Sequence, residues 1–260
     1  MNCKIAIPSL SRASILVDRT LKLILKYGIE PSNIYVFIIP SEYEEYRTAI
    51  SDIQNSSGIN IITGLKGISE QRGFISNFFD ENEFILTMDD DIRKISELDN
   101  NTLTPLFSLK SLNERVYDLI EGGGTCGIYP CNNPFFMKCY ISKNLKFVIG
   151  CMRWFINNRH IETSRQFKLL EDYEVSLKYF VDYGKIHRLN NICVDHDFNG
   201  KLAGGLASVA DRSYSEKKKE VDKFYKKYKD YCSINQRKLK TGDKIDIKFR
   251  KMRQVQFKEL

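Results

Sequence analysis

The sequence has no apolar run that approaches the length of a membrane-spanning helix, which needs about 20 consecutive apolar residues. Near its start, Pro8, Ser9 and Ser11 interrupt the apolar stretch before a signal-like core can form. Cys-x-x-Cys pairs are also missing, and the seven cysteines are scattered among apolar segments. This usage is typical of reduced thiols in cytoplasmic proteins. We therefore expect a cytoplasmic protein without a membrane span.

The sequence also lacks a Walker loop, and most of it lacks an excess of positive charge. There is no Walker loop, the glycine-rich segment that ends in Gly-Lys-Ser/Thr, which disfavours nucleoside triphosphate hydrolysis. Positive charge is not in excess over residues 1–212, which carry 24 basic and 26 acidic side chains, whereas residues 213–260 carry 16 and 7. The net charge of +7 therefore arises in the last 48 residues, which excludes a uniformly basic protein that coats DNA.

The first half of the chain alternates strand and helix patterns. Short apolar runs indicate strands, and amphipathic or capped segments between them indicate helices, at 4–7, 15–27, 34–39, 41–50, 60–63, 69–79 and 84–88 in turn. Strands that alternate with helices in this way form a mostly parallel sheet with helices on both faces. We therefore predict an α/β, Rossmann-like fold, an architecture that commonly binds nucleotides.

The pattern is looser in the second half. Ser111 and Glu114 have capping-box spacing for a helix that ends at Gly122, and further short elements are expected at 126–130, 147–151, 172–183, 186–189 and 192–194. Ser213 and Glu216 predict a last helix, with aromatic residues on one face and lysines on the other, and 245–249 alternates as a strand with a basic face. We assign 1–212 to one domain and 213–260 to a basic extension packed on it.

Three consecutive acids, Asp89, Asp90 and Asp91, directly follow the apolar strand predicted at 84–88. The carboxyl edge of a parallel sheet is where ligands bind, and adjacent like charges repel unless a cation or water shields them. The three acids therefore predict either a metal site or a solvated turn. Hard oxygen ligands without a thiolate favour Mg²⁺ or Mn²⁺, which commonly bridge diphosphates.

A strand that ends in Asp-x-Asp, inside an alternating α/β domain that begins with Ile-Ala-Ile-Pro-Ser, resembles the GT-A fold of nucleotide-sugar glycosyltransferases. Four motifs carry a narrower resemblance: Ile5-Ala-Ile-Pro-Ser-x-x-Arg12, Gly67-Ile-x-x-Gln71-Arg72, Asp89-Asp-Asp-Ile92 and Glu171-Asp172. Together they resemble phage TET-associated glycosyltransferases, enzymes that add sugars to hydroxymethylated bases such as hydroxymethylcytosine in bacteriophage DNA. The resemblance covers about residues 3–212. It implies that 1–91 form a nucleotide-sugar-binding half and 92–212 an acceptor half.

The resemblance also implies roles for particular residues. Contacts to a nucleotide sugar, with a UDP-sugar expected, fall on Pro8, Ser9, Arg12, Gln71, Arg72, Asp89 and Asp90. The metal ligands would be Asp89 and Asp91, with His196 as a later ligand. An inverting reaction would use Asp172 as the general base that deprotonates the acceptor hydroxyl, with Glu171 orienting either Asp172 or the acceptor. Each has a plainer reading: acids at a helix start are stabilised by the helix dipole, and a loop histidine is often only hydrogen-bonded.

The acceptor side is predicted from charge and aromatic residues. We place Arg153, Trp154, Lys201, Gly204, Gly205 and Arg212 there, with the basic extension as the partner surface for modified DNA. The alternatives are a glycan, lipid or protein acceptor, a metal-dependent nuclease that uses residues 89–91 with Glu171 and Lys178, and a non-catalytic nucleic-acid-binding module. A sugar-nucleotide pyrophosphorylase shares the fold but needs a glycine-rich N-terminal loop with a lysine, and residues 8–12 do not provide one.

Overall fold

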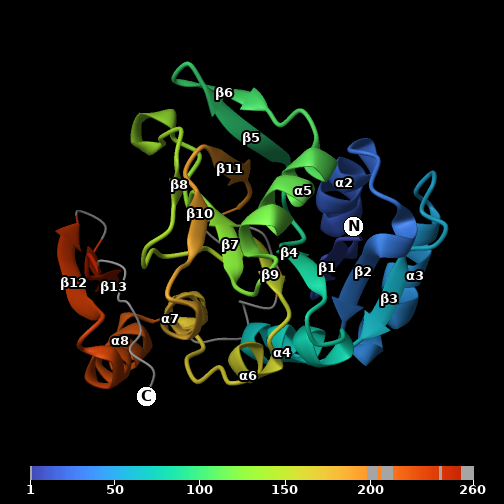
Figure 1. Cartoon of the computed structure of the whole chain (residues 1–260). Helices are drawn as coiled ribbons and strands as arrows, with labels where there is room; N and C mark the ends of the chain where they lie inside the picture. The colour runs from blue at the N-terminus through green and yellow to red at the C-terminus, as the bar shows by residue number, and fades with distance from the viewer. Residues whose placement is uncertain (1, 198–203, 206–212, 240–241, 253–260) are drawn as a thin grey trace.

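The computed structural model describes residues 2–197, 204–205, 213–239 and 242–252, and it confirms the α/β fold (Figure 1). The main sheet has the strand order β3-β2-β1-β4-β9-β7-β10-β8. Its strands are β1 (Lys4–Pro8), β2 (Ile34–Ile38), β3 (Asn60–Thr63), β4 (Phe84–Met88), β7 (Thr125–Ile128), β8 (Ile141–Ser142), β9 (Met152–Ile156) and β10 (His187–Leu189). The half from β3 to β4 is entirely parallel. In the other half, β9 runs antiparallel between β4 and β7.

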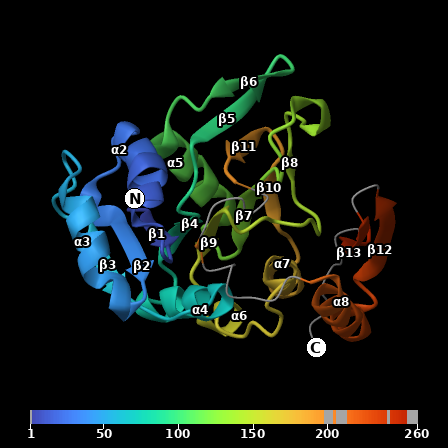
Figure 2. The ribbon, with the colours of Figure 1, turned by 180° about the vertical axis from the view of Figure 1, so that it is seen from behind.

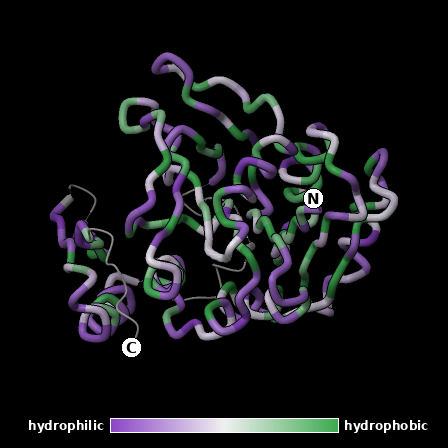
Figure 3. The backbone as a smooth tube through the Cα atoms, viewed as in Figure 1, coloured by the Kyte–Doolittle hydropathy of each residue, from purple (hydrophilic) through white to green (hydrophobic). Residues whose placement is uncertain are grey.

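Helices cover both faces of this sheet. One continuous helical segment is formed by α1 (Ala13–Leu16), the π-helix η1 (Val17–Leu21) and α2 (Lys22–Lys26). The longer helices are α3 (Tyr43–Ser51), α4 (Ile68–Phe78), α5 (Leu109–Ile120) and α7 (Glu171–Tyr183), and the short ones are α6 (Arg159–Glu162), η2 (Pro31–Asn33), η3 (Pro40–Glu42) and η4 (Pro134–Phe136). Because strand side chains alternate between faces, Leu86 packs with α2 and α5, while Ile85 packs with α4 and α7. The central strands are mostly apolar, and the outer loops are mostly hydrophilic (Figure 3).

A smaller sheet of order β11-β5-β6 lies beside the carboxyl end of β4. It consists of β5 (Lys94–Asp99), β6 (Thr102–Pro105) and β11 (Ile192–Asp195). Because β5 begins three residues after Asp91 and β11 pairs antiparallel with it, Asp195 is the register partner of Lys94. This pairing brings the segment that follows β11, including His196, back to the end of β4.

The C-terminal part of the chain consists of α8 (Tyr214–Tyr228), β12 (Cys232–Leu239) and β13 (Gly242–Phe249), which we call the C-terminal module. It packs beside α7 and is seen there from both sides (Figures 1 and 2). Its buried side chains include Val221, Phe224 and Ile247, which share an apolar cluster with Leu177 and Phe180 of α7. The predicted amphipathic helix and its Ser213 cap are confirmed, since the Ser213 hydroxyl accepts a hydrogen bond from the Glu216 N–H.

Two sequence predictions about local structure are wrong. The strand expected at 147–151 lies instead at Met152–Ile156, where five consecutive buried residues form β9. The cap of α5 is Ser108 rather than Ser111, because the Ser108 hydroxyl accepts from the Ser111 N–H. The β5-β6 hairpin and the strand β12 were not predicted. Within the described ranges, no helix is long and apolar enough to span a membrane.

Candidate functional site

The three acids form a turn directly after β4, held through its backbone by three distant segments. The Asp89 N–H donates to the Cys151 carbonyl (2.9 Å), and the Arg93 N–H donates to the Asp195 carbonyl (2.8 Å). The Thr20 hydroxyl, from η1, donates to the Asp89 carbonyl (2.8 Å) and accepts from the Ile92 N–H (2.9 Å). The turn is therefore fixed in place rather than free in solvent.

Asp89, Asp91 and His196 converge on one point. One ligand atom from each lies within 4.8 Å of the others. Two ligands on opposite sides of one Mg²⁺ or Mn²⁺ are about 4.2 Å apart, so these atoms need only small shifts to share an ion. Asp91 Oδ1 is buried and has no hydrogen-bond partner among the described residues. Since an orphaned buried carboxylate oxygen is costly, the donor set fits a divalent cation.

Asp90 points to the other side of the turn, toward the end of β1. Its Oδ2 accepts from the Ser9 hydroxyl (2.6 Å), and its Oδ1 lies 3.2 Å from Arg12 Nη1. Ser9 also shares a 2.7 Å hydrogen bond with the Tyr46 hydroxyl. Burial raises the pKa of Asp90 to about 6, although Ser9 and Arg12 oppose the shift. Pro8, the last residue of β1, is buried.

Gly204 and Gly205 lie against this same end of β1. Their φ angles are 77° and 88°, in the region that favours glycine. The Gly205 N–H donates to the Leu10 carbonyl (2.8 Å), and a Cβ at Gly205 would lie 2.6 Å from Arg12 Cζ. The pair therefore needs glycine because its backbone lies so close to Arg12, on the side of the turn that holds Asp90. Lys201 and Arg212, predicted nearby, lie outside the described residues.

Arg72 connects the metal-binding turn to the predicted catalytic pair. It extends from α4, and its Nη1 contacts both Glu171 and Asp172, the latter at 2.7 Å, while its Nη2 lies 3.7 Å from Asp89 Oδ1. Asp172 Oδ2 also accepts from the Gly150 N–H (3.1 Å). A Cβ at Gly150 would lie 2.3 Å from Arg72 Nη1 and 2.4 Å from Asp172 Oδ1. Gly150, which the sequence analysis did not select, therefore lets these side chains meet.

The two acids at the start of α7 differ in exposure and charge. Burial raises the pKa of Glu171 to about 7 against the opposing effect of Arg72, and its side chain is only 8% exposed. For Asp172, burial also acts to raise the pKa, but Arg72, Glu171 and the Gly150 N–H outweigh it, and its pKa is lowered. The Asp172 side chain is 27% exposed. Asp172 is therefore the acid of this pair that is both ionised at neutral pH and accessible.

A second buried ion-pair cluster contacts Glu171 on the side away from Arg72, through Arg165. Arg165 contacts both Glu171 and Glu162. Glu162 also receives two hydrogen bonds from Arg153, at 2.8 and 2.9 Å. Charged hydrogen bonds of this kind hold side chains in one geometry. Arg165 was missed in the sequence analysis, and no local pattern around it indicates a buried arginine.

Two residues predicted to contact the acceptor belong to the core instead. Arg153 and Trp154 lie in the central strand β9 and are 4% and 0% exposed. The Trp154 indole N–H donates to Asn113 Oδ1 of α5 (2.8 Å), and Arg153 is paired with Glu162. The prediction that they are available to stack on an acceptor is wrong, because helices cover both faces of the sheet at β9.

Gln71 is likewise fully buried. Its Oε1 accepts from the Leu65 N–H (2.6 Å), and a Cβ at Gly64 would lie 2.3 Å from that oxygen. Gln71 therefore shapes the loop before α4. Arg72, at 6% exposure with three carboxylates around it, has little surface left for a diphosphate.

Comparison with known proteins adds little to this geometry. No protein-family model matches the sequence, and no curated protein matches it. Among solved structures, 4-diphosphocytidyl-2C-methyl-D-erythritol synthase from Anaerococcus prevotii is 12% identical with a TM-score of 0.43, over 70% of this chain and 83% of that one. An enzyme assigned as a glucose-1-phosphate thymidylyltransferase from Bacillus anthracis, in complex with sucrose, is 8% identical with a TM-score of 0.45, over 72% and 85%. At TM-scores this low neither likeness carries an argument, and the α/β assignment rests on the observed sheet order.

Proposed function

We propose that this chain is a metal-dependent glycosyltransferase that moves a sugar from a nucleotide diphosphate sugar to a hydroxyl acceptor. The observation that carries the proposal is the position of Arg72, which contacts both a carboxylate of the metal group, Asp89, and the accessible acid Asp172. A metal-ligand set and a candidate general base therefore meet around one buried guanidinium at the carboxyl edge of the sheet. Transfer from a diphosphate donor needs both functions side by side.

The ligands for the cation would be Asp89, Asp91 and His196, with Mn²⁺ or Mg²⁺ as the ion. When bound, the ion neutralises negative charge on the diphosphate leaving group. Arg12 lies on the β1 side of the same turn, where we place the nucleoside of a UDP-sugar. Ser9 and Asp90, 1% and 4% exposed, support that side from within rather than contact the nucleoside. We assign Arg72 to holding Asp89, Glu171 and Asp172 in position, in place of the diphosphate contact that the sequence suggested.

Asp172 is our candidate for the general base. Its lowered pKa keeps the carboxylate ionised at neutral pH, so it can accept a proton only as the acceptor hydroxyl ionises in the transition state. The contacts from Arg72 and the Gly150 N–H fix its orientation and leave part of the side chain exposed. Glu171, almost fully buried, orients Arg72 rather than the acceptor. An inverting outcome follows from a base of this kind acting in a single displacement.

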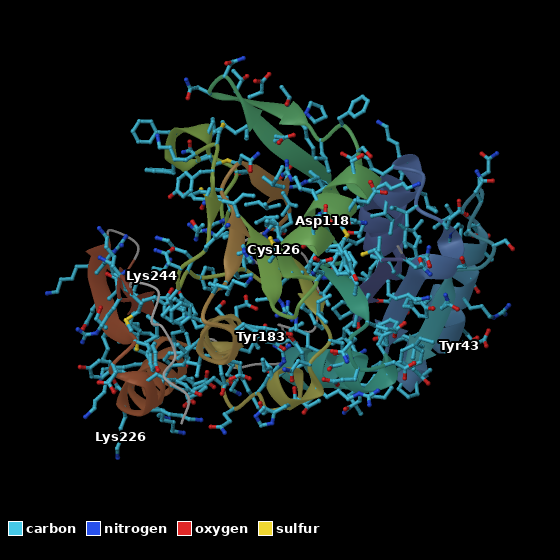
Figure 4. All side chains as sticks on the ribbon, viewed as in Figure 1. Tyr43, Asp118, Cys126, Tyr183, Lys226 and Lys244 are labelled. Atoms are coloured by element: carbon cyan, nitrogen blue, oxygen red, sulfur yellow. The ribbon has the colours of Figure 1, made fainter. Side chains whose placement is uncertain are left out.

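For the acceptor, we propose a hydroxymethylated pyrimidine in DNA. The C-terminal module carries many exposed basic residues. We call this set the basic face, and it consists of Lys218, Lys219, Lys223, Lys226, Lys227, Lys229, Arg237, Lys238, Lys244, Lys248 and Arg250. Of the two that Figure 4 labels, Lys226 belongs to α8 and lies at the lower edge of the molecule, and Lys244 belongs to β13. A cluster of this size neutralises several phosphates, so binding to DNA is expected to weaken steeply with added salt.

The other acceptor classes and activities make different predictions. A glycan, lipid or protein acceptor would leave the basic face without a part in catalysis. The nuclease alternative is less well supported, because Lys178 pairs with Glu174 (3.0 Å) and contacts Ser164. A nucleotidyltransferase would instead join a nucleoside triphosphate to a sugar phosphate and release pyrophosphate.

The test is a panel of labelled nucleotide sugars with Mn²⁺ or Mg²⁺ against DNA that contains hydroxymethylcytosine, unmodified DNA and a small glycan. Parallel reactions with a nucleoside triphosphate and a sugar 1-phosphate, and with DNA alone, report nucleotidyltransferase and nuclease activity. We expect label transfer to the modified DNA only. Asp91→Ala should abolish transfer, whereas Asp118→Ala, an exposed acid on α5, should not. Full activity of Asp91→Ala would refute the metal site.

A further inference from the structure

Thr20 is a fully buried hydroxyl that touches the backbone of the metal-binding turn. It lies in the π-helix η1, between α1 and α2, and is 0% exposed. A single oxygen, Thr20 Oγ1, donates to the Asp89 carbonyl at 2.8 Å and accepts from the Ile92 N–H at 2.9 Å. The hydroxyl therefore bridges the two ends of the segment that contains all three acids.

This bridge has a direct geometric consequence. Asp89 and Asp91, which lie within the bridged segment, supply two of the three converging ligand atoms. Arg72 lies 3.7 Å from Asp89 and Arg12 lies 3.6 Å from Asp91, but the two carboxylates that converge on one point still repel each other, and that repulsion favours a wider turn. Of the groups that hold this turn, the Cys151 carbonyl fixes Asp89, and the Asp195 carbonyl fixes Arg93. Thr20 joins both ends through one atom, and so limits the separation of the two carboxylates.

The π-helix itself fits this role. A π-helical turn holds one more residue than an α-helical turn, and such segments often occur at functional sites. In this chain Leu16, Thr20, Leu21 and Ile24, which lie in or next to the π-helix, are all fully buried. The polar member of this set faces the turn, and the apolar members pack in the core.

We propose that Thr20 is a positioning residue that preorganises Asp89 and Asp91 for the divalent cation. The inference rests on the metal site of the proposed function and deepens it. Loss of a residue that holds metal ligands in place typically weakens metal affinity by about 10- to 100-fold. Replacement of the hydroxyl by a methyl group leaves the Asp89 carbonyl and the Ile92 N–H unpaired, which frees the turn to widen.

The experiment measures Mn²⁺ binding to the full chain by electron paramagnetic resonance, without nucleotide or acceptor. Thr20→Val removes the hydroxyl at nearly constant volume, and Thr20→Ser keeps it while removing the methyl group. We expect the dissociation constant to rise by about 10- to 100-fold in Thr20→Val and to stay within a few-fold of the unmodified protein in Thr20→Ser. A purely structural role would lower the melting temperature of both variants and leave the Mn²⁺ affinity of the folded protein unchanged.

Unchanged Mn²⁺ affinity in folded Thr20→Val would overturn the inference, and an equal loss in Thr20→Ser would do the same. If Thr20→Val does not fold, Thr20→Ala serves in its place with the same expected weakening, and near-ultraviolet circular dichroism of the buried Trp154 verifies folding. If the unmodified protein binds no Mn²⁺, the metal site of the proposed function fails first. That result is distinct from binding that Thr20→Val leaves intact.

Discussion

Replacement of Glu162 by glutamine should remove a specific part of the acid sensitivity of this protein. Glu162 is 1% exposed and lies between Arg153 and Arg165. Burial acts to raise its pKa, but the two arginines outweigh that effect and lower it to about 2, from 4.5. Because the folded-state pKa is below the unfolded value, the carboxylate stabilises the fold fully above about pH 4.5 and loses that contribution as the pH falls toward 2.

The magnitude follows from the shift. A difference of about 2.5 in pKa corresponds to roughly 3 kcal/mol, of which about 2 kcal/mol is lost between about pH 5.5 and pH 3. Glu162→Gln should be less stable by about 3–5 kcal/mol near neutral pH, because it leaves the buried Arg153 without its counter-charge and leaves Arg165 with Glu171 alone. Its stability should also fall less on acidification, by about 2 kcal/mol over that interval.

Urea unfolding at several pH values measures both effects, with Glu81→Gln, an exposed acid, as the control. The unfolding free energies of the unmodified protein and of Glu162→Gln should converge as the pH is lowered. Curves that stay parallel from neutral pH to pH 3 would show that Glu162 does not carry this charge, and the reasoning about the cluster behind Glu171 would fail.

Two further changes separate catalysis from positioning. Asp172→Asn should keep nucleotide-sugar binding, measured by calorimetry, and lower the transfer rate by about 10²- to 10⁴-fold; a normal rate would remove Asp172 as the base. Glu220 of α8 accepts hydrogen bonds from the Lys168 and Leu169 N–H groups, at 3.0 and 2.8 Å, just before α7. Glu220→Gln should therefore lower kcat several-fold with little change in donor KM, whereas Asp222→Asn on the same helix should change neither; equal kcat in both variants would argue against the role of Glu220.

The parallel half of the sheet could be predicted because each of its strands and helices has a recognisable pattern in its own stretch of sequence. Each of β1 to β4 is a short apolar run, and in the helices between them apolar residues recur every three or four positions. The acid turn after β4 was identified for the same reason, since a strand end and a ligand edge coincide in a parallel sheet. The resemblance to GT-A enzymes selected Glu171 and Asp172, and the structure brings both to Arg72.

Central strands with a buried charge were harder to predict. The strand β9 contains Arg153, whose charge suggested exposure, and its partner Glu162 lies nine residues later on α6. The alternation of apolar and polar residues, which predicts a half-buried strand, is absent from a strand that is buried on both faces and also holds an arginine. The same limit led to the prediction that Trp154 is a stacking residue. Arg165 lies in the loop after α6, where no local pattern indicates a buried arginine.

Contacts between distant segments were the other part that local patterns could not indicate. Thr20 meets Asp89 across 69 positions, and Arg72 meets Asp172 across 100. His196 was selected through the resemblance to GT-A enzymes, as the best placed of three histidines for a later metal ligand, and its position follows from the pairing of β11 with β5. Such pairings depend on the tertiary arrangement of the sheet rather than on residue spacing.

The C-terminal module has two roles that removal of the whole segment would confuse. Its exposed face is basic, but its buried face completes the apolar cover of α7, and Glu220 holds the backbone just before Glu171. Deletion of 213–260 would expose Leu177 and Phe180, disturb the start of α7 and lower transfer to any acceptor. Substitutions of exposed lysines that leave Val221, Phe224 and Glu220 in place change only the charge. The dependence of transfer on salt in such variants therefore reports DNA contact, because their catalytic pair remains supported.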